Sequence, residues 1–306
     1  MRQTTARLFQ SFRPLYHENP LGLPRSGTPP TWAKRPQRRK ITGVETVIAV
    51  SSAKGGVGKS TVAVFTHINV NEAANLSLAF ARLGFRAGIL DTDIFGPSIP
   101  TLFDLSGEPR LSRNNQLVPL TNYGVKTMSM GYLVGENAPV VWRGPMVMKA
   151  IQQLLHEVDW GGLEILVLDL PPGTGDTQLT ITQQVILDGS IIVTTPHTLA
   201  TKDAVKGINM FKAVGVNILG LVQNMSLFVC PHCHGKTNVF GSSERVERMC
   251  KDHEICFLGD IPLHPNIGDD AERGKPTVVA EPSSERASAF LRVADKILPK
   301  VGLERN

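Results

Sequence analysis

AKGGVGKS, residues 53–60, follows the apolar run at residues 47–50 and decides the fold of this 306-residue chain. Glycines let a backbone turn tightly and approach a ligand closely, and in a loop of this spacing successive N–H groups point inward. The loop opens a helix, so amides, helix dipole and Lys59 converge on phosphate groups while the Ser60 hydroxyl reaches Mg²⁺. The stretch predicts a nucleoside triphosphate site made by Gly55, Gly56, Val57, Gly58, Lys59, Ser60 and Thr61.

Two further stretches end in carboxylates at positions that a nucleotide site needs. Residues 88–93 and 163–169 each read as a short buried strand that ends in aspartate. Because the carboxyl ends of parallel strands meet at one edge of a sheet, Asp93 and Asp169 are expected near the phosphate loop. Asp169 then holds Mg²⁺, directly or through water, and Asp93 orients the attacking water. The alternative is that these aspartates only end strands and cap helices.

Lys54 is an extra lysine that phosphate binding does not require. A lysine at the second position of the loop resembles the deviant Walker group, which includes MinD, ParA and the nitrogenase iron protein. In those relatives the lysine reaches across a dimer interface to the partner's nucleotide. The resemblance implies that the candidate catalytic residues are Lys54, Lys59, Asp93 and Asp169.

Strand and helix patterns alternate along the chain after residue 40. The expected strands are 47–51, 87–91, 125–130, 164–169, 191–195, 218–223 and 255–261, and the clearest helices are 146–157, 176–187, 198–213 and 284–298. This alternation predicts an α/β fold, a mostly parallel sheet with helices on both faces, of the deviant Walker P-loop NTPase type. No apolar run approaches the ~20 residues that cross a bilayer.

The first 40 residues differ in charge from the rest. They hold nine Lys/Arg and one Glu, a net charge of +8, whereas the whole chain carries +5, which leaves about −3 for residues 41–306. The basic pI therefore reflects this leader and predicts no nucleic-acid partner. Apolar residues recur at near-helical spacing among arginines in residues 8–16, as in a mitochondrial presequence, and residues 22–40 read as a linker. A disordered basic tail is the alternative. We expect residues 1–40 to be presequence and linker and residues 41–306 to be the NTPase domain.

Four cysteines suggest a second chemistry. Cys230 and Cys233 have the two-residue separation of metal-chelating pairs and lie in a turn-rich stretch, but one pair supplies half of a four-thiolate site. An intrachain zinc site that adds Cys250 and Cys256 is the alternative. Its five-residue separation fits chelation poorly, and Cys256 reads as part of a buried strand.

Residues 93–98, 171–176, 224–226 and 230–233 together resemble the Mrp-type P-loop iron–sulfur carrier ATPases. Residues 129–131, 140–148 and 221–226 look most like the mitochondrial nucleotide-binding-protein-like branch, assembly factors for respiratory complex I. The resemblance implies a carrier in the mitochondrial matrix that binds ATP and Mg²⁺, has weak ATPase activity, and delivers its cargo to iron–sulfur apoproteins, including those of complex I. It implies a homodimer in which Cys230 and Cys233 of both subunits share one [4Fe–4S] cluster, and it assigns adenine contact to Asn224. A partitioning or positioning ATPase of the ParA/MinD kind is the alternative function.

Residues 65–74 depart from the family pattern, which runs from Val64 directly into Asn75. Ten extra residues make about 2.8 helical turns, so a continuous helix would rotate its apolar face by roughly 80° away from the sheet. We therefore expect the insert to loop out or to distort the helix.

Overall fold

In the computed structural model, the described residues are 38–52, 68–93, 96–133, 144–230, 232–233 and 235–305. The phosphate loop lies outside these ranges. From Arg38 onward the chain forms one compact unit. The backbone of Arg39 exchanges hydrogen bonds with Gln184 and Ile186 (2.9 and 3.0 Å), and Ile41 is buried in the core. The folded body therefore begins close to residue 39.

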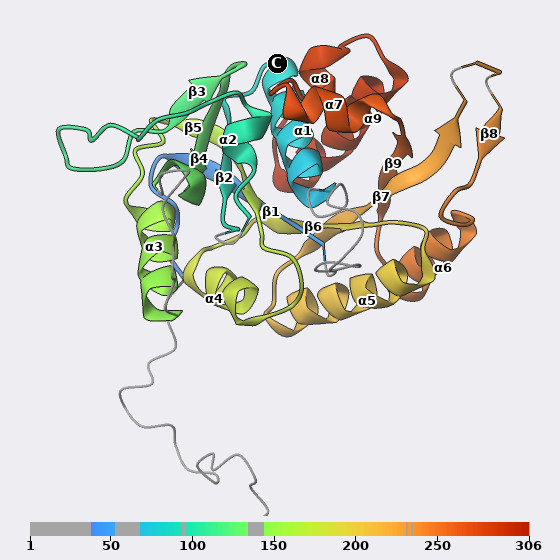
Figure 1. Cartoon of the computed structure of the whole chain (residues 1–306). Helices are drawn as coiled ribbons and strands as arrows, with labels where there is room; N and C mark the ends of the chain where they lie inside the picture. Colours follow the sequence, from blue (N-terminus) through green and yellow to red (C-terminus); the bar gives the residue numbers. More distant parts are fainter. Residues whose placement is uncertain are drawn as a thin grey trace, which may run out of the picture. The chain divides into compact units, whose positions relative to one another are not determined.

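Nine strands in the described part of the chain form one sheet in the order β3-β4-β2-β5-β1-β6-β7-β8, with β9 also paired to β7 (Figure 1). All pairs are parallel except β3–β4 and β7–β8. The strands are β1 (Val44–Ser51), β2 (Ala87–Asp91), β3 (Leu120–Asn122), β4 (Val125–Ser129), β5 (Leu163–Asp169), β6 (Gly189–Thr194), β7 (Ile218–Val229), β8 (Lys236–Thr237) and β9 (Phe257–Leu263).

Helices cover both faces of the sheet, which confirms the expected fold class (Figure 1). On one face lie α1 (Ile68–Arg82), α2 (Ile99–Leu102), α8 (Thr277–Ala280) and α9 (Glu285–Ile297), and on the other α3 (Gly144–His156), α4 (Asp176–Gln184), α5 (Thr198–Ala213) and α6 (Glu244–Asp252). The remaining helical segments are α7 (Asn266–Glu272) and the 3₁₀ turns Met130–Tyr132 and Leu298–Val301. The central strands are buried on both faces, because apolar side chains from each helical layer meet them.

Most predicted elements occur with small shifts at their ends, but three differ in ways that affect the site. The strand expected at 218–223 continues to Val229, and the helix expected to end at 187 ends at Gln184. The strand expected at 255–261 spans Phe257–Leu263. Cys256 therefore precedes this strand and is exposed, so the prediction that its side chain is buried was wrong.

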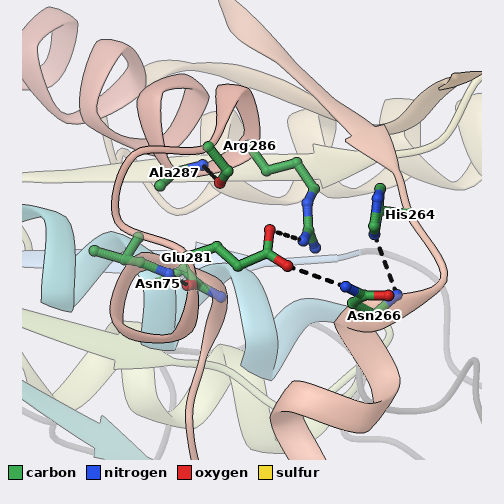
Figure 2. Close-up of polar contacts among 8 residues, drawn as sticks. Asn75, His264, Asn266, Glu281, Arg286 and Ala287 are labelled. Carbon is green, nitrogen blue, oxygen red and sulfur yellow. Dashed lines mark hydrogen bonds and ion pairs between the residues drawn. The ribbon is translucent and has the colours of Figure 1, made fainter. Parts of the chain in front are cut away.

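A polar network joins the C-terminal helices to the carboxyl end of β9 (Figure 2). The carboxylate of Glu281 pairs with the buried Arg286 and accepts a hydrogen bond from Asn266 Nδ2 (3.0 Å). The backbone N–H of Asn266 donates to His264 Nδ1 (3.2 Å). Asn75 on α1 accepts from the N–H of Val278 (2.9 Å), so this network and α1 are held together at the same end of the sheet.

No helix among the described residues is long and apolar enough to cross a membrane.

Candidate functional site

Strand register brings the predicted carboxylates to one edge of the sheet. Asp169, the last residue of β5, pairs with Asp91 on β2 and with Val50 on β1. The segment that leaves β1 after Ser52 therefore starts beside Asp169. That segment contains the predicted nucleotide-binding and catalytic residues Lys54, Gly55, Gly56, Val57, Gly58, Lys59, Ser60 and Thr61, which all lie outside the described residues.

Asp169 has the surroundings of a cation ligand. Its side chain is 1 % exposed, and neither carboxylate oxygen has a hydrogen-bond partner among the described residues. The backbone carbonyl of Asp169, by contrast, accepts two hydrogen bonds from Thr92, one from its N–H (3.1 Å) and one from its Oγ1 (2.6 Å). Burial raises the pKa of Asp169 well above its usual value, and the charges of Asp91, Asp93 and Glu72 add to this. A divalent cation satisfies such a buried, orphaned carboxylate.

Asp91, to which we assigned no role, organises the loop that carries Asp93. Its Oδ1 accepts from Asp93 N–H (2.9 Å), and its Oδ2 accepts from Ser129 Oγ (3.0 Å) and from Ser98 N–H (3.2 Å). Burial raises the pKa of Asp91 to about 7. Asp93 itself is half-buried, and its role in orienting water stays a prediction. The sequence feature that could have identified Asp91 is its position as the last residue of a predicted buried strand.

The loop and helix after β5 are hydrogen-bonded to the residues that precede the phosphate loop. Gly173 has φ of +99°, a conformation that glycine adopts easily, and its N–H donates to the carbonyl of Ser52 (3.1 Å). Buried Gln178 on α4 donates from Nε2 to Ser51 Oγ (3.1 Å) and to the carbonyl of Pro171. Gln178 was not predicted from the sequence. The only feature that could have identified it is a long amide side chain on the face of a helix that packs against the sheet.

Part of the insert at residues 65–74 belongs to helix α1. Residues 68–74 belong to the unbroken helix α1, and Ala73 and Ala74 are fully buried, so these residues neither loop out nor distort the helix as expected. Residues 65–67 lie outside the described residues. The apolar positions after Asn75 still face the sheet, where Leu78 and Phe80 join the core. Within the described residues, 68–74 form the N-terminal part of α1, the helix that covers β1, β2 and β5.

Asn224 lies at the carboxyl end of the β7 segment that pairs with β6 and is 4 % exposed. Its Oδ1 accepts from Met225 N–H (2.7 Å), and its Nδ2 donates to Glu72 Oε1 on α1. Both side-chain groups of Asn224 therefore have protein partners in this structure. Its contact with a nucleotide base remains a prediction.

Strands β7 and β8 form a hairpin (Figure 1), and Cys230 and Cys233 belong to the segment between the two strands. Phe228 and Val229 pair with Thr237 and Lys236, and Cys230 N–H donates to the carbonyl of Gly235 (3.0 Å). This hairpin was not predicted from the sequence, because the polar residues Asn224 and Ser226 interrupt the apolar run. The pair is thus presented on a short antiparallel arm.

The environment of the pair favours thiolates. Cys233 is exposed and Cys230 is half-buried. Hydrogen bonds from the backbone amides of Cys233 and His232 lower the pKa of Cys230. Thiolates are the form that binds iron and zinc, so this donor set fits a metal or an iron–sulfur cluster.

The intrachain four-cysteine alternative does not form in this structure. All four cysteines are described, and no three His, Cys, Asp or Glu side chains within the described ranges are arranged to hold a metal ion. Cys250 is buried on α6, where burial raises its pKa to about 11. The described residues of one chain therefore do not by themselves form a complete four-thiolate site.

A sequence profile of the ParA family described as "NUBPL iron-transfer P-loop NTPase" matches residues 43–298. The chain belongs to this family. The match confirms the resemblance drawn from the motifs. Mouse "Iron-sulfur cluster transfer protein NUBPL" is 47 % identical over 268 residues, covering 87 % of this chain and 81 % of that protein. Arabidopsis thaliana "Iron-sulfur protein required for NADH dehydrogenase, mitochondrial" is 44 % identical over 260 residues, covering 85 % and 80 %.

The fold of this NUBPL-family chain also matches solved structures. A nucleotide-binding protein from Archaeoglobus fulgidus, in complex with ADP, aligns with a TM-score of 0.66 and 34 % identity over 82 % of this chain and 94 % of that one.

Proposed function

We propose that this protein is an ATP-dependent carrier of a [4Fe–4S] cluster. The observation that carries the proposal is the cysteine pair on the β7–β8 arm, with amides that stabilise the Cys230 thiolate and with no further ligand among the described side chains. A [4Fe–4S] cluster takes four thiolates, so two chains that each contribute Cys230 and Cys233 complete one site. A two-fold axis through the cluster satisfies the geometry of a C₂ dimer.

In this proposal ATP binds on the loop between β1 and α1. Lys59 and the loop amides hold the phosphates, Ser60 and Asp169 hold Mg²⁺, and Lys54 reaches the partner's nucleotide. Mg²⁺, when bound, neutralises charge on the phosphates. Asp93 orients water for a slow hydrolysis. The orphaned carboxylate of Asp169 supports the metal role.

Strand β7 offers a direct route between the two sites. Asn224 and Cys230 are separated by six positions along the chain, and Met225 between them has φ of +52°. The register of β7 against β9 shifts between Asn224 and Phe228, so regular pairing is interrupted there. We propose that nucleotide state acts at the Asn224 end, moves the arm about this irregular segment, and so changes retention of the cluster.

The names of the relatives support delivery to iron–sulfur apoproteins, including subunits of complex I. They also favour a carrier over a partitioning ATPase. The Arabidopsis relative is named mitochondrial, and the basic leader at residues 1–40 fits import into the matrix. N-terminal sequencing of protein from isolated mitochondria tests this, because import with processing removes Met1 and leaves a new terminus before Ile41.

Iron and sulfide analysis after anaerobic reconstitution tests the carrier function. We expect about two irons per chain, because two chains share one cluster. Cys230→Ser and Cys233→Ser remove the iron, whereas Cys250→Ser, a matched thiol change at a buried position, leaves it unchanged. Equal iron loss in the Cys250 variant would contradict the proposed ligands.

A further inference from the structure

Glu72 is a buried carboxyl that neither the motifs nor the family pattern anticipates. It belongs to the inserted residues and lies in the first turns of α1, 5 % exposed. Its Oε1 accepts a hydrogen bond from Asn224 Nδ2, and its Oε2 is buried with no hydrogen-bond partner among the described residues. Burial raises its pKa well above the usual value. A buried carboxyl with one unused oxygen is costly to the fold.

The position of Glu72 opposes nucleotide binding. It engages the Asn224 amide, the group that the family resemblance assigns to the base edge, so a base must displace this contact. Because burial favours the neutral form of Glu72, the hydrogen bond to Asn224 is what this residue contributes at the site.

We propose that Glu72 weakens nucleotide binding by engaging the side-chain amide of Asn224. This inference rests on the proposed ATP function. It assigns the insert a role as an internal competitor of nucleotide, because the base must displace Glu72 from Asn224.

Equilibrium binding to the full-length chain, with ATP and with inorganic tripolyphosphate, tests this effect. Glu72→Ala frees the Asn224 amide, so ATP should bind about tenfold more tightly. Tripolyphosphate, which has no base, should bind as it does to wild type. Glu72→Gln keeps an acceptor for Asn224, so both affinities should stay within about twofold of wild type. Glu45→Gln, an exposed carboxyl at the start of β1, is the matched control and leaves both affinities unchanged.

Urea unfolding verifies that each variant is folded, and Glu72→Ser carries the test if the Ala variant is not. Unchanged or weaker ATP binding in the folded Ala or Ser variant overturns the inference. A chain without residues 65–74, in which Val64 joins Asn75, separates this result from failure of the proposed function. If that chain binds ATP, only the role of Glu72 falls. If no variant binds ATP, the nucleotide function falls and this role with it.

Discussion

The four cysteines show how one residue type acquires different chemistry from its surroundings. Cys230 lies in a turn whose amides point at its sulfur, which lowers its pKa, whereas Cys250 is buried on α6, which raises its pKa to about 11. The thiolate is the nucleophile and the metal ligand. Reactivity should therefore separate the two residues without any metal present.

We expect Cys230 to react with iodoacetamide at pH 7 at least about tenfold faster than Cys250 in the native apo protein. Mass spectrometry of peptides from a time course measures both rates in one sample, and the same time course in urea removes the difference. Equal rates in the native state would mean that the hairpin amides do not stabilise the Cys230 thiolate.

The contribution of Asp169 to folding stability changes with pH in the direction opposite to that of most acidic side chains. Its folded pKa lies above the unfolded value of about 3.9, so the native state holds this proton more tightly than the unfolded chain does. The contribution to stability is fully present below about pH 4 and is lost as pH rises toward the folded pKa. Asp91, with a pKa of about 7, acts in the same direction.

The Asp169→Asn variant should be more stable than wild type at pH 7 in Mg²⁺-free buffer, by about 1–3 kcal/mol, because it removes an unpaired buried charge. Urea unfolding at pH 4 and pH 7 measures this, and the advantage of the variant should shrink at pH 4. A variant less stable than wild type at pH 7 would show that Asp169 is satisfied in the apo protein.

At the scale of elements, the strands that could be predicted are those with a clear apolar pattern. Continuous buried runs at β1, β2 and β5, and the aspartates that end β2 and β5, were predictable because short uninterrupted apolar runs indicate buried strands. The β7–β8 arm was not predictable, since Asn224 and Ser226 interrupt the apolar run and the pairing depends on a partner strand only two residues long. The contact between Glu72 and Asn224 was also hidden, because it joins residues 152 positions apart.

The link between α9 and the end of β9 gives an element-scale prediction. Arg286 is 4 % exposed, and Glu281 is its ion-pair partner (Figure 2). Glu281→Ala leaves a buried guanidinium without that partner and removes the bond to Asn266, so it should destabilise the protein by about 2–4 kcal/mol.

Glu285→Ala is the matched control, because Glu285 pairs with Arg292 in solvent, with side chains 75 % and 57 % exposed. This variant should change stability by less than about 1 kcal/mol. Urea unfolding of both variants provides the comparison. Similar losses of stability would indicate that the buried pair contributes no more than a surface pair.

At the scale of the whole molecule, the sheet places two chemistries on one polypeptide. The phosphate edge lies where β1, β2 and β5 end, and the cysteine arm continues from β7 at the same edge of the parallel strands. The fold class and the cysteine pair were predictable from motifs. The second half of the proposed cluster site could not be predicted from one sequence, because a two-fold partner would repeat the same residues and leave no separate pattern.

Native mass spectrometry of the anaerobically reconstituted full-length chain tests the shared cluster most directly. The account predicts that iron and sulfide appear only in a dimer that carries one [4Fe–4S] unit, and that Cys233→Ser leaves iron-free protein while Cys250→Ser retains the loaded dimer. A monomer that carries a complete [4Fe–4S] unit would contradict it.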